Sequence, residues 1–252
     1  MLVETQTVLR YKESFSLFVY RILDMVRMAP SHELRNTLKN EVRFLYGLLR
    51  MIKDVDTTQA SIDELIEWSA VLGSDIPLDV FKDMYTDKLK RLNLSKFEPQ
   101  KFVFTFSTIW DCIHLLCLMC DDAIINRHND SYENILSFVR NLKWVYYNIF
   151  IVLFCPVCAR HYLTVNTFPF ELERIEIALY REHMGEPIQM VDECINRSQS
   201  HKNVLYRHHL VYVSMLFHNH VNGYRPIQHK KDDLNRFQRM EWGIYKNLLG
   251  LK

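Results

Sequence analysis

The feature of this sequence that most constrains its fold is the spacing of its apolar residues. They recur every three or four positions over most of the chain, as in the series Phe15, Phe18 and Ile22. This period places apolar side chains on one face of an α-helix, whereas a half-buried strand alternates with a period of two. Only 6 glycines and 7 prolines interrupt 252 residues, so a sheet-rich fold would lack the turns it needs. The sequence therefore predicts an all-α protein, built as a helical bundle.

Breaks in this periodicity divide the chain into two helical halves. In the first half, a capping-box pattern that begins at Ser61 predicts the start of one helix. The segment 93–102 loses the period and contains a proline, so we take it as the main linker. We therefore expect a helical N-terminal domain over residues 1–100 and a second helical domain over residues 101–252, in which the polar segment 185–202 forms a loop.

Charge and hydropathy exclude several classes of function. The formal net charge is +1, which gives no electrostatic reason to expect a nucleic acid or an anionic membrane as a partner. The most apolar stretch, residues 145–154, is too short to span a bilayer and contains an asparagine, so we expect no transmembrane segment. Residues 1–14 lack a basic region followed by an apolar core. We therefore expect no secretory signal and a reducing, intracellular location.

The cysteines admit three interpretations. There are six of them: Cys112, Cys117, Cys120, Cys155, Cys158 and Cys194. A zinc site would need four converging ligands, and the two Cys-x-x-Cys pairs lie farther apart than in common zinc motifs, so we expect no metal. Small buried apolar side chains are the simpler interpretation, and we expect it to hold for the cysteines outside the CPVC segment.

The CPVC segment, residues 155–158, favours redox chemistry. It follows an apolar stretch, and Pro156 suits the first position of a helix, which would place Cys155 at the helix N-terminus. The positive end of the helix dipole favours a thiolate there. A pair of this kind can close a disulfide and accept a substrate thiol, and we expect Cys155 and Cys158 to be catalytic. No βαβ unit surrounds the pair, so a helical bundle must carry it and must supply an electron acceptor.

Two groups of residues suit the binding of such an acceptor. Trp110, His114 and Cys117 share one face of a predicted helix, and Cys117 should face the cofactor as a small, space-filling residue rather than pair with Cys120. His218 and a nearby asparagine lie one turn apart on another helix. Each polar residue alone is more often a satisfied core residue. Together, an aromatic plane, imidazoles and amides fit flavin adenine dinucleotide (FAD) bound between helices.

Three motifs resemble those of the Erv/ALR family of FAD-linked sulfhydryl oxidases in order and in internal spacing. The family has a Trp-x-x-x-His helix, a Cys-x-x-Cys pair followed by a histidine and an aromatic residue, and a His-Asn-x-Val-Asn helix. The matching residues are Trp110 and His114, then Cys155, Cys158, His161 and Tyr162, then His218, Asn219, Val221 and Asn222. The length and the opening segment are most similar to the baculoviral members.

The resemblance implies an activity and a cofactor. Cys155 and Cys158 would be the redox pair, and the other motif residues would bind FAD together with Arg225 as a basic contact. The protein would make disulfides in protein thiols and pass electrons to oxygen, giving hydrogen peroxide. A degenerate N-terminal copy without cofactor, a homodimer, and a location in the host nucleus or cytoplasm and in the virion are also implied. The alternative is a helical structural or scaffold protein with a zinc-stabilised C-terminal half.

Overall fold

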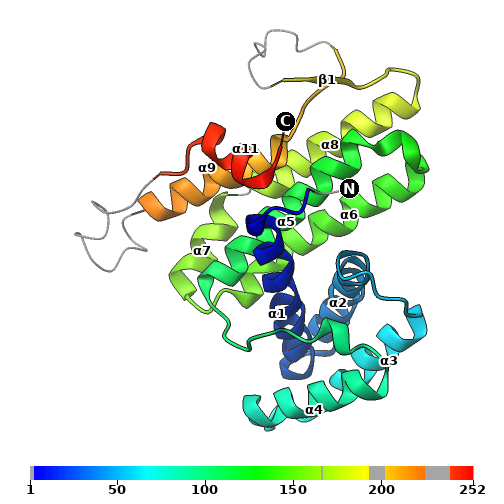
Figure 1. Cartoon of the computed structure of the whole chain (residues 1–252), viewed down its shortest axis with the longest axis vertical. Coiled ribbons are helices and arrows are strands. Elements are labelled where there is room, and N and C mark those ends of the chain that lie inside the picture. Colours follow the sequence, from blue (N-terminus) through cyan, green and yellow to red (C-terminus); the bar gives the residue numbers. More distant parts are fainter. Residues whose placement is uncertain (1–2, 166, 193–201, 225–238, 252) are drawn as a thin grey trace. The chain divides into compact units, whose positions relative to one another are not determined.

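Helices make up most of the protein. The computed structural model describes the following ranges: 3–165, 167–192, 202–224 and 239–251 (Figure 1). Within these residues, the strands are limited to β1 (Gln189–Val191) and β2 (Val204–Tyr206), so the prediction of an all-α helical bundle is confirmed. None of the helices in these ranges is both long and apolar enough to cross a bilayer.

The two short strands lie at one end of the helices. β1 falls within the segment that was expected to form a loop, and it pairs in parallel with β2. Asn203 explains this pairing. Its side-chain Nδ2 donates to the backbone carbonyls of Ala178 and Glu186, and its backbone carbonyl accepts from the N–H of Gln189. One buried amide therefore fixes the strand pair to the end of a helix.

The chain forms two compact units, which are Leu9–Cys112 and Ile113–Lys252 together with Met1–Val8. The division falls within the helix α5 (Phe106–Ile125). The segment expected as a linker lies inside the first unit, where Phe97 is fully buried. Whether residue 100 separates a cofactor-free domain from a cofactor-binding one stays a prediction.

Aromatic side chains dominate the core of the first unit. Its elements are α1 (Gln6–Met28), α2 (His32–Ile52), α3 (Gln59–Ala70), α4 (Leu78–Arg91) and the 3-10 helix η1 (Ser95–Phe97). The hydroxyls of Tyr46 and Tyr85 are 2.9 Å apart and fully buried. Thr58 caps α3 by accepting from the N–H of Ser61, so the start predicted at Ser61 is wrong. Thr58 can cap too, and it stands three residues earlier.

The second unit contains the remaining elements. After α5 these are η2 (Arg127–Asn129), α6 (Tyr132–Asn148), η3 (Ile149–Val152), α7 (Pro156–Val165), α8 (Thr167–His183), α9 (His209–Gly223) and α11 (Trp242–Leu249). The helices α6 and α8 pack against each other, and α8 also contacts α9. Tyr162 ties α7 to α6, because its hydroxyl donates to the carbonyl of Tyr146 over 2.6 Å. This bond fixes the helix that begins with the CPVC segment.

Candidate redox site

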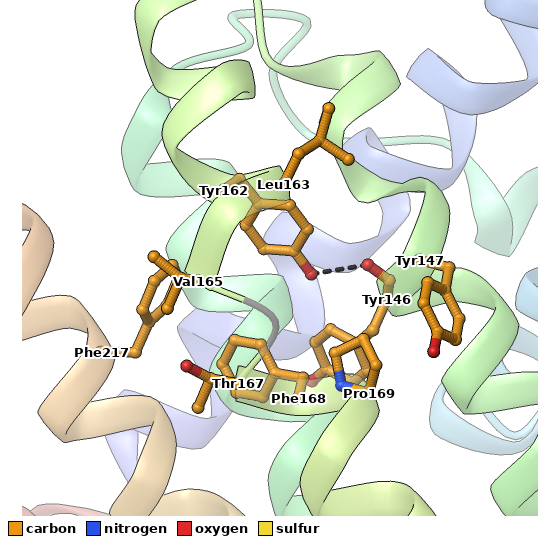
Figure 2. A pocket seen from close by; sticks show the side chains of 9 residues that line it. All are labelled: Tyr146, Tyr147, Tyr162, Leu163, Val165, Thr167, Phe168, Pro169 and Phe217. Carbon is orange, nitrogen blue, oxygen red and sulfur yellow. Dashed lines mark hydrogen bonds between the residues drawn. The ribbon is translucent and has the colours of Figure 1, made fainter.

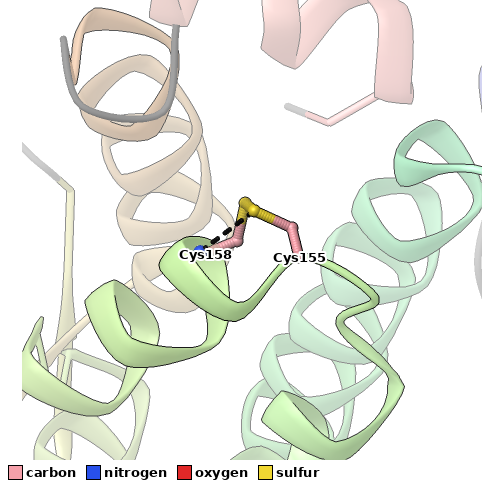
Figure 3. Close-up of a disulfide and its surroundings, with 2 residues drawn as sticks. All are labelled: Cys155 and Cys158. Carbon is pink, nitrogen blue, oxygen red and sulfur yellow. Dashed lines mark hydrogen bonds between the residues drawn. A yellow bond between two sulfur atoms is a disulfide. The ribbon is translucent and has the colours of Figure 1, made fainter.

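The CPVC segment starts α7, as the proline predicts, with Pro156 as the first helical residue. Cys155 and Cys158 form a disulfide, and their Cα atoms are 5.2 Å apart (Figure 3). The backbone N–H of Cys158 donates to Sγ of Cys155 over 3.2 Å. This N–H belongs to the first helical turn, where backbone donors lack partners within the helix, so it favours negative charge on that sulfur. The geometry therefore suits a thiolate on Cys155 after reduction.

The disulfide can be reached from outside the molecule. Both cysteines are partly exposed. The side chains of Phe154 and Val157 flank them in the sequence and are 59% and 48% exposed. Thiol–disulfide exchange requires access to the attacked sulfur, and this region provides it without a rearrangement of α7.

A stack of rings connects α7 to α9. His161, one turn after Cys158, is buried, and its Nε2 lies 3.1 Å from Nε2 of His220. The ring of Tyr224 stacks on His161, with centroids 4.0 Å apart and planes 14° from parallel. Burial lowers the pKa of His161, and the neighbouring His220 lowers it further. His161 therefore presents a neutral imidazole face at neutral pH.

A second pair of imidazoles connects α5 to α9. Nδ1 of His114 lies 2.8 Å from Oγ of Ser214, and its Nε2 lies 3.0 Å from Nδ1 of His218. Ser214 donates its own hydrogen to the carbonyl of Val211, so its oxygen accepts from Nδ1–H of His114. In a neutral His114, Nε2 then accepts from His218. Burial lowers the pKa of His218 to about 4, so its ring is neutral and keeps Nε2 as an acceptor.

An aromatic pocket lies where α6, α7, α8 and α9 meet (Figure 2). Its lining is Tyr146, Tyr147, Tyr162, Leu163, Val165, Thr167, Phe168, Pro169 and Phe217. Behind Tyr146 lies Cys117, whose Sγ is 3.0 Å from the tyrosine hydroxyl. That hydroxyl donates to the carbonyl of Ile113, so the thiol is the donor to it. Cys117 fills space in the core, and its contact with a cofactor stays a prediction.

Comparison with known proteins identifies the family. The family described as Baculovirus P33 matches residues 5–251. This chain belongs to the Baculovirus P33 family. It is 35% identical over 250 residues to the FAD-linked sulfhydryl oxidase of Autographa californica nuclear polyhedrosis virus, with 96% of each chain covered. It is 33% identical over 273 residues to the 33 kDa early protein of Orgyia pseudotsugata multicapsid polyhedrosis virus, which covers 96% of this chain and 97% of that protein. The resemblance to baculoviral members is confirmed.

In this P33 family member, Asn219 of α9 binds the backbone of the segment that precedes α11. Its Nδ2 donates to the carbonyl of Met240 over 3.0 Å, and its Oδ1 accepts from the N–H of Met240 over 2.9 Å. The amide thus clamps the residues just before α11 to α9. Its expected contact with a cofactor stays a prediction.

The sequence motifs missed two aromatic residues on α11. The ring of Tyr245 packs edge-on against His114, with centroids 5.4 Å apart, and Trp242 packs against Tyr212 of α9 at 5.2 Å. The buried Nε1–H of Trp242 has no hydrogen-bond partner among the described residues. Such an orphaned donor costs about 1–3 kcal/mol unless a ligand meets it. Only the tertiary contacts reveal this group, because α11 lies far from the motifs in sequence.

Two further ring contacts, those of His220 and Tyr224, were also missed. A signal was available, since His220 and Tyr224 are four residues apart and therefore share one helix face. That face is not the face of Ser214 and His218, and this P33 chain uses both faces of α9. The His-Asn-x-Val-Asn motif leaves the position of His220 unspecified and ends before Tyr224.

The other predicted site residues have less defined positions. Trp110 is partly exposed on α5, one turn before the imidazole pair, and Val221 and Asn222 are partly exposed in the last turn of α9. Arg225 and Cys194 lie outside the described residues.

The free cysteines of the P33 chain are Cys112, Cys117 and Cys120, as far as the described residues extend. All three are fully buried, and burial raises the pKa of each thiol. They are therefore poor nucleophiles. In the same residues, no group of three or more His, Cys, Asp or Glu side chains is placed to hold a metal ion.

Proposed function

We propose that this protein is an FAD-dependent thiol oxidase that forms disulfide bonds in protein substrates. The observation that carries the proposal is the partly exposed Cys155–Cys158 disulfide at the N-terminus of α7, one turn before the ring stack of His161. A helix N-terminus stabilises the thiolate that forms on reduction, so a disulfide there accepts electrons readily. The relative named FAD-linked sulfhydryl oxidase supports both the reaction and the cofactor.

The residues around α9 fit a flavin nucleotide. Such a ligand needs aromatic or apolar walls and a few placed polar groups. The stacked rings on His161 and the orphaned Nε1–H of Trp242 meet these needs. The residues that we expect to hold FAD are Trp110, His114, Cys117, His161, Tyr162, His218, Asn219, Val221, Asn222, Arg225 and Trp242.

The thiol chemistry uses the two cysteines in different roles. A substrate thiolate attacks Sγ of Cys155, the disulfide breaks, and Cys158 leaves as a thiolate while the substrate stays bound to Cys155. A second substrate thiolate attacks the substrate sulfur of this mixed disulfide and releases the oxidised substrate. Cys155 now leaves as a thiolate, which the N–H of Cys158 stabilises. When bound, FAD would supply the two-electron acceptor that the pair needs to reoxidise, with dioxygen as the final acceptor, so that two thiols and O2 would give a disulfide and hydrogen peroxide.

Substrate thiols reach Cys155 directly in this proposal. The exposed side chains of Phe154 and Val157 leave room for a polypeptide beside the disulfide.

Dioxygen is the proposed electron acceptor. A second copy of the chain is the proposed partner in a homodimer, and light scattering of the purified protein can test this.

A flavin spectrum of the purified protein tests the function. We expect a yellow protein that releases FAD on denaturation and forms hydrogen peroxide with DTT. A colourless protein that loses its structure to a chelator would instead favour the zinc-stabilised scaffold.

A further inference from the structure

The mechanism above does not use the buried carboxylate of Asp121 on α5. Asp121 is 5% exposed. Its Oδ1 accepts from the N–H of Leu210 at 3.2 Å and its Oδ2 accepts from the N–H of Val211 at 3.0 Å. These N–H groups lie in the first turn of α9 and have no partner within the helix. His208, which precedes α9, makes no side-chain cap, so Asp121 supplies from another helix the cap that α9 lacks.

This cap belongs to a ladder of contacts between α5 and α9. Asp121 lies seven residues after His114, which is two turns of helix, so both face the same way. On α9, Ser214 and His218 lie one and two turns beyond Val211. The helices therefore run antiparallel, with Asp121 at one end of the ladder and the imidazole pair at the other. A slide of α9 by one residue would shift its groups by about 1.5 Å and break the bonds of His114.

We propose that Asp121 is a positioning residue, which holds α9 in the register that pairs His114 with His218 and thereby strengthens the binding of FAD. The inference rests on the proposed function, because it concerns FAD held between α5 and α9. Asp121 itself touches neither substrate nor the reacting sulfurs.

The strength of this cap depends on whether Asp121 is protonated. Burial raises its pKa to about 7, while the two backbone N–H groups and His209 act in the opposite direction. The charged and titratable groups around it are Tyr206 of β2, His208 before α9, His209 of α9, Glu171 and Arg174 of α8, and Cys117 and Cys120 of its own helix. Glu171 forms an ion pair with Arg174, and its Oε2 lies 2.8 Å from Nε2 of His209.

Protonation removes one of the two cap bonds. A neutral carboxyl keeps a carbonyl oxygen as acceptor, but its O–H oxygen accepts poorly. The register of α9 is therefore held best above pH 7 and loosens below it. The free energy of unfolding depends on pH in the opposite direction. A carboxyl whose pKa is raised in the folded state adds stability below pH about 4, and this stability is lost as the pH rises through about 7. The informative measurement is therefore FAD release rather than unfolding.

Asp121→Asn tests the proposal, because the amide copies the protonated carboxyl and keeps one acceptor oxygen. The rate of FAD dissociation from the purified holoprotein is followed by flavin fluorescence at pH 8 and pH 6. We expect Asp121→Asn to release FAD about tenfold faster than the parent at pH 8, the size of one lost cap bond. At pH 6 the two rates should agree within about twofold, because the parent is then mostly protonated.

Asp122→Asn is the matched control, since it removes a carboxylate from the next position of α5, where the side chain is less buried. It should release FAD as the parent does at both pH values. An Asp121→Asn protein that matches the parent at pH 8, or an equal effect of Asp122→Asn, would overturn the proposal. A parent protein without flavin would overturn the proposed function itself, and this inference with it.

Discussion

The two compact units bury different polar groups. In Leu9–Cys112 they include the hydroxyl pair of Tyr46 and Tyr85 and the ion pair of Asp24 with Arg27. The sequence of this unit contains a single histidine, His32, and it is not buried. In Ile113–Lys252, the buried polar groups include imidazoles, thiols and a carboxylate on facing helices.

This difference explains how similar helices can carry different chemistry. A hydroxyl pair or an ion pair within the core stabilises the fold. The C-terminal unit contains the buried Nε1–H of Trp242, which has no hydrogen-bond partner among the described residues, and a partly exposed disulfide that can accept electrons. That the N-terminal domain, residues 1–100, binds no cofactor stays a prediction.

The largest effect is expected from substitution of the redox cysteines, which lie in the C-terminal unit. Cys155→Ser or Cys158→Ser should lower DTT oxidation to background, because either change removes the disulfide that accepts electrons. Bound FAD should remain, as the flavin absorbance will report. Cys112→Ser, in the other unit, is the control and should keep most of the activity. Substantial turnover of DTT by Cys158→Ser would disprove the mechanism.

The next effect concerns the cofactor itself. The double variant His218→Ala and Asn222→Ala should be purified without FAD, and it should unfold at a lower temperature, because a ligand that binds only the folded state stabilises it by mass action. Absorbance and thermal unfolding with and without added FAD will measure both changes. If this protein held stoichiometric FAD with an unchanged spectrum, these side chains would be packing residues only.

A smaller effect is expected from the corresponding change in the N-terminal unit. Tyr46→Phe removes one hydroxyl of the buried pair, and we expect it to lower the free energy of unfolding by about 1–2 kcal/mol. Urea denaturation will measure the loss, and the flavin content should equal that of the parent. Tyr85→Phe should cost a similar amount, and the double variant less than the sum, because the two hydroxyls share one bond. Loss of flavin from Tyr46→Phe would contradict the division of roles between the units.

The fold was predictable from the sequence because it depends on local periodicity. The spacing of apolar residues specifies helices, and Pro156 specifies the start of α7, wherever the neighbouring residues agree. The predicted start of α3 was wrong because Thr58 and Ser61 can both cap a helix and the sequence does not show which of them does. β1 was missed because three residues form a strand only after Asn203 has anchored its partner.

The site was predictable only where it follows motifs. The disulfide at the start of α7 follows from local chemistry, as do the positions of His114 and His218 on their helices. The pairing of these imidazoles, the cap that Asp121 gives to α9, and the contact of Tyr245 with His114 depend on contacts across about 90 residues or more of sequence. Long-range pairings of this kind leave no periodic signal in the chain.

The smallest expected effect concerns Cys194, which lies outside the described residues. It is alone in a polar segment of the sequence, and a single thiol cannot store two electrons in an intramolecular disulfide. We therefore expect protein thiols to attack Cys155 directly, for which the partly exposed disulfide beside Phe154 and Val157 has the necessary access. Cys194→Ser should therefore oxidise a reduced protein about as fast as the parent, measured as hydrogen peroxide formed over time. Loss of activity toward protein thiols with retained activity toward DTT would make Cys194 part of a relay, and direct attack would be wrong.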